Sequence, residues 1–120
     1  MRGASHMGSL RVHVVYDDGA WFAQGLELDY ASEGTTLAQA QEHFERGLMS
    51  TVLLNTTGDS EAQKEAKIRS LLSPAPKSVW DECLQDVLAG RIKPDRRTSD
   101  AVRLLPFDSV LYLVRFSTTN

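Results

Sequence analysis

The chain has 120 residues, a hydrophobic content of 42%, a charged content of 24% and a formal net charge of −3. This length suits one domain and the composition is that of an ordinary globular protein, which excludes collagen-like, fibrous and wholly disordered classes. The negative charge argues against a general electrostatic attraction to nucleic-acid phosphates.

The first nine residues, Met1 to Ser9, are typical of an expression-vector leader, and we expect one folded domain over 10–117. The single cysteine, Cys83, excludes an intramolecular disulfide and a cysteine metal cluster. No apolar run approaches the roughly 20 residues of a membrane span, and the leader has no apolar segment of a secretory signal. The sequence therefore predicts a protein of the reducing cytoplasm that has no membrane partner.

The N-terminal third predicts an antiparallel β-meander. Residues 10–17 alternate with period two, and one face of this strand carries Leu10, Val12, Val14 and Tyr16, the other Arg11, His13, Val15 and Asp17. The pair Asp18-Gly19 is typical of a tight hairpin turn. Residues 20–26 then predict a second, aromatic strand, and residues 28–32 a short third one.

A long amphipathic helix follows the meander. Thr36 and Gln39 match a capping box at its start, and the helix should end near Asn55, before the turn formers 56–60. One apolar stripe recurs at three- and four-residue spacings and should cover the sheet: Leu37, Ala40, Phe44, Leu48 and Val52.

The second half is less regular. Residues 61–72 predict a marginal helix with few apolar positions. A further helix should begin at the cap Ser78, end before Gly90, and carry a broad apolar stripe formed by Val79, Trp80, Cys83, Leu84, Val87 and Leu88. Residues 91–103 form a basic stretch that we interpret as a loop. Val110 to Phe116 predicts a central strand, because both of its faces are apolar.

The blocks 18–23 and 31–40, which are Asp-Gly-Ala-Trp-Phe-Ala and Ala-Ser-Glu-Gly-Thr-Thr-Leu-Ala-Gln-Ala, lead into the long helix. This arrangement resembles the HicB family of antitoxins over about residues 10–55. The resemblance implies a degenerate, catalytically inactive RNase H-like fold, in which a helix packs on a meander and a later strand completes the sheet. We therefore expect an α/β (α+β) domain of order β-β-β-α-α-α-β, with a helical insertion at about 56–109.

The resemblance also implies a function and partners. Family members neutralise small ribonuclease toxins, form oligomers through the sheet or a strand edge, and usually append an operator-binding module. Only Ser117-Thr118-Thr119-Asn120 follow Phe116, so we expect a non-catalytic protein-binding module, either a toxin-neutralising antitoxin or an orphan HicB-like protein without the DNA-binding tail. A homodimer is a further expectation.

Catalytic, metal and cofactor sites find no support in the sequence. The helix stripe adds no inward carboxylate to a possible two-metal nuclease site. The carboxylates that could suggest such a site belong to turns or to the surface, and they are Asp17, Asp18, Glu27, Asp29 and Glu33. Nothing joins His13 or His43 to a nucleophile. Cys83 has carboxylate neighbours that raise a thiol pKa, and phosphate-binding glycine loops are absent. We expect no enzyme, no metal and no cofactor.

Two candidate binding surfaces remain. The first is the basic stretch, with Arg91, Lys93, Arg96, Arg97 and Arg103, which is either a solvated loop or a contact for an acidic protein or a nucleic acid. A nucleic-acid-binding regulator that uses 91–103 is the alternative function. The second is the sheet face away from the long helix, with Val15, Trp21, Leu111 and Leu113. Either the helices within 61–89 cover this face or it is an interface.

Overall fold

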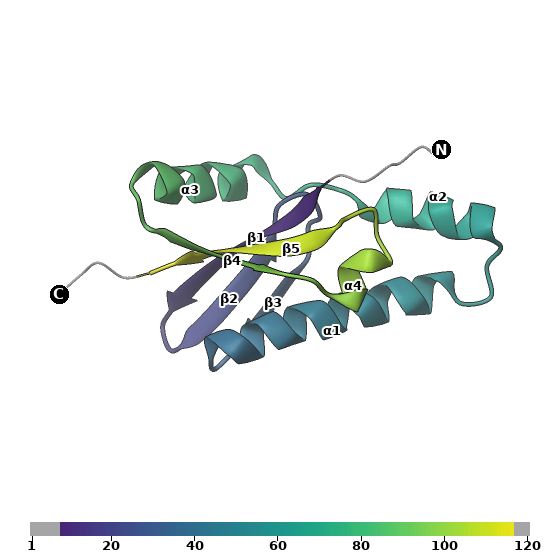
Figure 1. Cartoon of the computed structure of the whole chain (residues 1–120), viewed down its shortest axis with the longest axis horizontal. Coiled ribbons are helices and arrows are strands. Elements are labelled where there is room, and N and C mark those ends of the chain that lie inside the picture. The colour runs from purple at the N-terminus through teal and green to yellow at the C-terminus, as the bar shows by residue number, and fades with distance from the viewer. Residues whose placement is uncertain (1–7, 117–120) are drawn as a thin grey trace.

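The computed structural model describes residues 8–116, so most of the predicted leader and the last four residues lie outside the described part. Nine elements follow one another along the chain (Figure 1). They are β1 (Ser9–Asp17), β2 (Ala20–Gly25), β3 (Ala31–Gly34), α1 (Leu37–Thr56), α2 (Glu61–Leu71), α3 (Lys77–Leu88), β4 (Ile92–Arg97), α4 (Asp100–Arg103) and β5 (Ser109–Arg115). The predicted mixed α/β class is confirmed.

The five strands form one sheet of order β3-β2-β1-β5-β4. The meander β1-β2-β3 is antiparallel, whereas β5 returns parallel to β1 and lies between β1 and β4. The prediction of a central returning strand is therefore confirmed. Its face toward α1 carries Val110, Tyr112 and Val114, which pair with the buried Leu10, Val12 and Val14 of β1.

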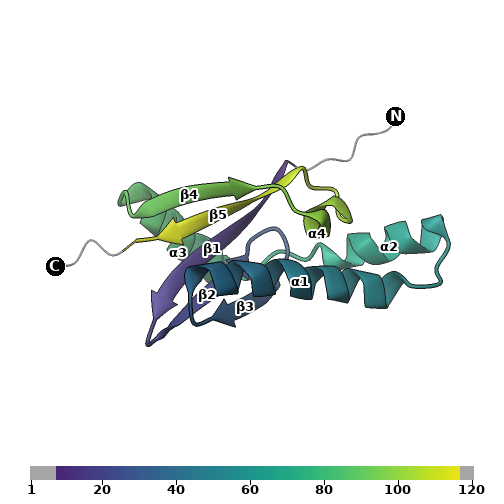
Figure 2. The ribbon, with the colours of Figure 1, turned by 60° about the horizontal axis from the view of Figure 1, so that its bottom comes forward.

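The core lies between the sheet and α1, which crosses the meander in Figure 2. The predicted stripe is confirmed, because Ala40, Phe44, Leu48 and Val52 are all buried. Phe44 makes edge contacts with the rings of Tyr30 and Tyr112, at centroid distances of 5.3 and 6.4 Å. These contacts hold α1 against β5 and the loop before β3, since aromatic pairs add about 0.5–1.5 kcal/mol beyond burial.

Three boundary predictions need correction. Thr36 caps α1, but the Gln39 side chain accepts from the backbone N–H of Thr35 rather than closing the box on Thr36. The third strand is β3 at Ala31–Gly34 instead of 28–32, because the buried Leu26 and Leu28 belong to a loop closed by the Gly25 N–H to Tyr30 O bond. The N-cap of α3 is Pro76, so Ser78 lies inside the helix.

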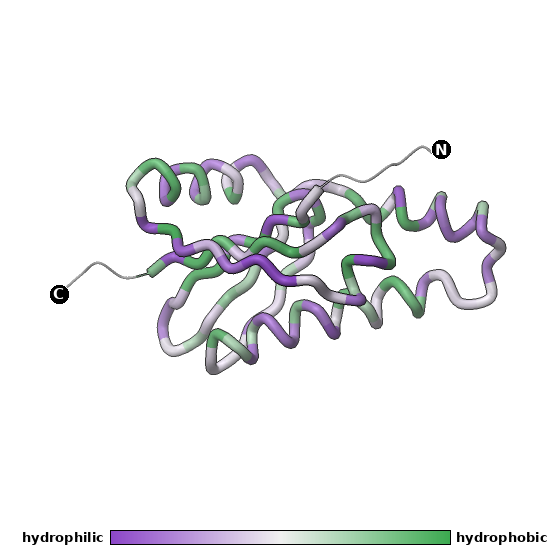
Figure 3. The backbone as a smooth tube through the Cα atoms, viewed as in Figure 1, coloured by the Kyte–Doolittle hydropathy of each residue, from purple (hydrophilic) through white to green (hydrophobic). Residues whose placement is uncertain are grey.

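The predicted basic loop is also wrong, because it contains β4 and α4. The strand lies at the sheet edge, where Pro94 is tolerated although it has no N–H to donate to a ladder. Charged side chains and proline also protect an edge from pairing with other chains, which explains why this strand has the composition of a loop. Figure 3 shows β4 in largely hydrophilic colours.

The helices occupy two sides of the sheet. α1 and α4 cover one face, and α3 lies over the opposite one (Figures 1 and 2). α2 folds back beside the C-terminal half of α1, beyond the end of the sheet, and has no buried residue. Its amphipathic pattern is weak, as predicted for a marginal helix. Within the described residues, no helix is both long and apolar enough to span a membrane.

Gly34 is the last residue of β3, shortly before α1 begins, and we predict that Gly34→Ala destabilises the fold. A Cβ atom there would lie 2.5 Å from the backbone nitrogen of Ala40, and backbone atoms cannot move aside as a flexible side chain can. Overpacking of this kind costs about 1–3 kcal/mol, which chemical denaturation would measure. The neighbouring exposed change Glu33→Ala should stay within about 0.5 kcal/mol of wild type, and equal stabilities for the two variants would contradict the close approach.

Candidate protein-binding surface

A buried carboxylate anchors α3 to the sheet. Asp86 is 1% exposed and accepts hydrogen bonds from His13 Nε2 of β1 and Arg115 Nε of β5, both at 2.7 Å. Arg91, just beyond α3, adds contacts at 3.2 Å to its other carboxylate oxygen. Arg115 also reaches Glu82 one turn earlier, at 2.7 Å. The helix is therefore tied to two neighbouring strands through one side chain.

The electrostatics of this cluster favour the ionised form of Asp86. Burial alone would raise the pKa of this carboxyl, but the hydrogen bonds from Arg115, His13 and Arg91 outweigh burial and hold the pKa below its ordinary value. Burial likewise would lower the pKa of Arg115, whereas its bonds to Asp86 and Glu82 raise it. Each charge stabilises the others, so removal of Asp86 would leave cations without their counter-ion.

The same side of α3 carries further sheet contacts of a structural kind. The Arg11 guanidinium lies over the Trp80 ring, 5.1 Å from its centroid, and is held by the Glu27 carboxylate at 2.6 Å. Cys83 is buried, and its pKa is raised by burial and by the charge of Asp86. A thiol in this state is a poor nucleophile. No metal-binding group of three His, Cys, Asp or Glu residues occurs between residues 8 and 116.

The other side of α3 is apolar and open to solvent. We name Leu84, Val87 and Leu88 the α3 stripe; they are 54%, 48% and 77% exposed. These residues belong to the broad apolar stripe predicted for this helix, but only Cys83 of that set is fully buried. The polar Asp86 takes the place against the sheet that an apolar residue would normally hold. The helix thus presents to solvent the side chains that usually dock it.

The sheet face below α3 is only partly covered. We name Val15, Phe22, Leu111 and Leu113 the far face; Val15, Leu111 and Leu113 are half-buried and Phe22 is 38% exposed. Trp21, which the sequence placed here, lies instead on the α1 side, where its ring contacts the Tyr16 ring at a tilted angle, with the centroids 5.2 Å apart. The strand register decides this, because Phe22 pairs with Val15, and Trp21 with Tyr16. The helix α3 therefore covers Arg11, His13 and Arg115 and leaves the far face incompletely buried.

The basic residues do not form one patch. Arg96 shares the α3 side of the sheet with Leu111 and bonds to the hydroxyls of Ser9 and Ser109. On the opposite side, Arg97 pairs with Asp95 at 3.2 Å and lies over the Tyr112 ring. The remaining cations are spread over three elements or their ends: Arg91 on Asp86, exposed Lys93 in β4 and exposed Arg103 in α4. Strand alternation thus splits the charge between two faces.

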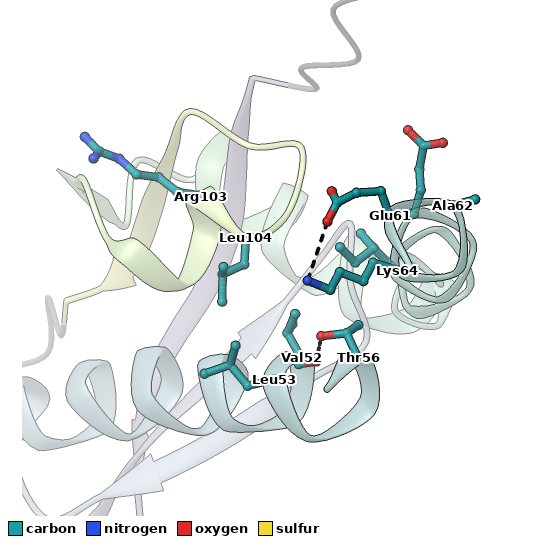
Figure 4. Close-up of a pocket in the computed structure, with 10 residues that line it drawn as sticks. Val52, Leu53, Thr56, Glu61, Ala62, Lys64, Arg103 and Leu104 are labelled. Carbon is teal, nitrogen blue, oxygen red and sulfur yellow. Dashed lines mark hydrogen bonds and ion pairs between the residues drawn. The ribbon is translucent and has the colours of Figure 1, made fainter. Parts of the chain in front are cut away.

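A second open surface lies at the far end of the molecule. α1, α2 and α4 enclose a groove of about 540 Å³ that we name the helical groove (Figure 4). Its apolar lining includes Val52, Leu53, Ala62, Ile68 and Leu104. Leu53 and Leu104 are 47% and 36% exposed, and both point into the space between the helices in Figure 4.

Comparison with known proteins gives no match to a family model, to a curated protein or to a solved structure.

Sequence reasoning missed the most connected residue of the site. Asp86 lies on the helix face that also carries Cys83, three residues earlier, and Cys83 was expected to be part of the apolar stripe. An acid that is buried on this face needs a basic partner on the strands that the helix covers. The alternation of β1 and β5 offers His13 and Arg115, both on the face away from α1. That coincidence of one inward acid with two inward basic groups was the available signal.

We predict that Asp86→Asn lowers the free energy of unfolding at neutral pH by roughly 3–5 kcal/mol, the usual cost of breaking a buried ion pair. Because the folded pKa of Asp86 is lowered, its contribution is present above the unfolded pKa of about 3.9 and is lost as the pH falls through the folded value. The difference between wild type and variant should therefore shrink as the pH falls from about 5 toward 2. Urea titrations at stepped pH would measure it.

The matched control is Asp81→Asn, on the same helix. Asp81 is half-exposed and, among residues 8–116, pairs only with Lys77, so its loss should change the free energy of unfolding by less than about 1 kcal/mol at any pH. A stability gap that is equally large for both variants, or one that does not depend on pH, would refute the anchoring role of Asp86.

Proposed function

We propose that this protein is a non-catalytic protein-binding module, similar to a HicB-type antitoxin, that holds its partner through the α3 stripe. The main observation behind this proposal is the exposure of Leu84, Val87 and Leu88. They lie on a helix whose sheet-facing side is held by the hydrogen bonds and ion pairs of the Asp86 carboxylate. Apolar side chains clustered in the open mark interaction surfaces. The far face lies on the same side of the sheet and would extend the contact.

The architecture supports the resemblance to that family. A helix packed on an antiparallel meander, with a later strand returning beside β1, is the arrangement that the resemblance implies. The charge supports the same class of partner. A ribonuclease toxin needs cations to hold RNA, and a partner of net charge −3 is electrostatically complementary to it. Such a pair would meet in the cytoplasm, where the RNA is.

The alternative, a nucleic-acid-binding regulator, receives less support. Its segment 91–103 contributes to a strand whose alternate residues face opposite sides of the sheet. Arg91 and Arg97 already have carboxylate partners, and Arg96 holds two serine hydroxyls. A duplex groove or a single strand would require these cations on one surface. The geometry therefore favours structural roles for most of them.

The proposal predicts that Leu88→Gln combined with Leu84→Gln abolishes partner capture and leaves the fold intact. Wild-type protein immobilised in lysate of its native cells should retain a specific partner, and the double variant should retain at least tenfold less. Burying one leucine side chain contributes about 1.5–3 kcal/mol, and about 1.4 kcal/mol corresponds to a tenfold change in affinity. Quantitative mass spectrometry of the eluates gives the ratio, and thermal unfolding monitors the fold.

The control is Leu54→Gln on α1. Leu54 is 81% exposed and Leu88 is 77% exposed, so the two substitutions are alike in chemistry and exposure but lie on different helices. Leu54→Gln should leave capture unchanged. The proposal fails if the α3 double variant captures the same proteins as wild type, or if wild type retains no partner. If the protein is an antitoxin, the retained partner should be a small basic protein encoded by the neighbouring reading frame.

A further inference from the structure

The sheet face beneath α3 carries basic groups that this helix covers and pairs with carboxylates. Strand alternation places Arg11 and His13 of β1 on the face away from α1, together with Arg115 of the neighbouring strand β5. α3 contributes two carboxylates one turn apart. Glu82 contacts Arg115 at 2.7 Å, and Asp86 contacts Arg115 and His13, both at 2.7 Å. The covered face is therefore built to hold an acidic helix, and α3 itself occupies it.

α3 is attached to the sheet by charged and aromatic groups rather than by an apolar core. Only Cys83 and Asp86 of its 12 residues are buried, and no side chain caps its N-terminus with a hydrogen bond. Among residues 8–116, the hydrophobic core cluster contains no residue of this helix, whereas α1 contributes Phe44, Leu48 and Val52. Elements with few buried apolar contacts open at a lower free energy than the core, so α3 can leave the sheet while the core stays folded.

The connections of α3 permit this movement. On one side, Ala75 is buried and its N–H donates to the carbonyl of Leu26. On the other side, the carbonyl of Arg91 accepts from the N–H of Phe116. The segment 76–90 between these two attachment points contains α3 and no strand, and Figure 1 shows a loop at each end of the helix. Release of the helix therefore breaks no strand pairing.

We propose that α3 is a displaceable cover and that the sheet face beneath it binds an acidic helix of a partner protein in its place. Two carboxylates of that helix, at positions i and i+4, contact His13 and Arg115 as Asp86 and Glu82 do. Residues at this spacing lie on one face of a helix, which favours a helix over other anionic ligands. This site excludes the α3 stripe and does not depend on the function proposed for it.

A peptide with the sequence of residues 76–91 serves as the probe, and the full chain carrying Asp86→Asn serves as the receptor. The substitution removes the central carboxylate from the chain's own helix, so the site should open to the peptide. Fluorescence anisotropy under reducing conditions should show saturable binding to this variant, at least about tenfold tighter than to wild type. A control peptide carrying Glu82→Gln and Asp86→Asn should bind the same variant at least about tenfold more weakly.

The matched control chain carries Asp81→Asn. Asp81 lies on the same helix and, among residues 8–116, pairs only with Lys77, so this chain should bind the peptide no more tightly than wild type. A second receptor serves if circular dichroism shows that Asp86→Asn does not fold. It is Glu82→Gln, which removes an exposed carboxylate from Arg115 and should raise the affinity for the peptide about threefold over wild type.

Hydrogen exchange of the wild-type chain in low urea tests the movement itself. The α3 amides should be protected, yet exchange at least about tenfold faster than the most protected amides of α1 and β1. Their exchange should depend only weakly on urea, because release of one helix exposes much less surface than global unfolding does.

Several results would overturn the proposal. They are the absence of saturable peptide binding to the receptor variant, equal affinities of the two peptides, or exchange of the α3 amides only through global unfolding. Tighter binding of a single-stranded oligothymidylate than of the peptide would identify a nucleic acid as the ligand and also overturn it. Loss of partner capture by the α3 stripe variants has no bearing on these readouts.

Discussion

The buried carboxylate of Asp86 is the interaction on which the arrangement of the second half depends. It meets basic groups from β1, from β5 and from the segment after α3, and thereby links parts of the chain that are far apart in sequence. A buried charge is costly unless every neighbour compensates it, so this geometry tolerates little displacement. Because hydrogen bonds are directional, the bonds of Asp86 to its fixed partners define where α3 lies and how it is rotated about its axis.

An ionic anchor has a consequence for the rest of the helix. Apolar docking would turn Leu84, Val87 and Leu88 toward the sheet, whereas the ion cluster turns Asp86 inward and leaves that stripe in solvent. α1 shows the opposite solution, since four of the five residues of its predicted stripe are buried and the fifth, Leu37, is partly buried against the core. The same chain thus holds the predicted stripe of one helix by burial and another helix by buried ion pairs, and the second arrangement leaves the α3 stripe in solvent. The helical groove has a different origin, namely the overhang of α1 and α2 beyond the sheet.

Local patterns predicted the elements that depend on one periodicity. The apolar stripe of α1 fits only a helix and the alternation of β5 fits only a strand, and both elements lie where the sequence predicted them. β4 was missed because an edge strand is built from the residues that otherwise indicate a loop, Pro94 and its charged neighbours among them. The rotation of α3 was also beyond the pattern, because six apolar positions surround Asp86 and its basic partners on the sheet, His13 and Arg115, are 73 and 29 residues away in sequence.

The candidate site shows the same limit. Val15, Leu111 and Leu113 were placed on the correct face, since alternation from a known strand suffices for that. The choice between Trp21 and Phe22 required the register across the hairpin, which depends on the turn at Asp18 and Gly19. The roles of Arg96 and Arg97 required the strand pairing of β4, which no local signal gives.

Hydrogen–deuterium exchange of the α3 amides at pH 7, in wild type and in Asp86→Asn, tests most directly whether charge holds this helix. If the Asp86 ion pairs hold the helix, wild-type α3 is protected and the variant loses protection from Trp80 to Leu88, while α1 and β1 keep theirs. Equal protection of α3 in both proteins would show that apolar contacts hold the helix without Asp86.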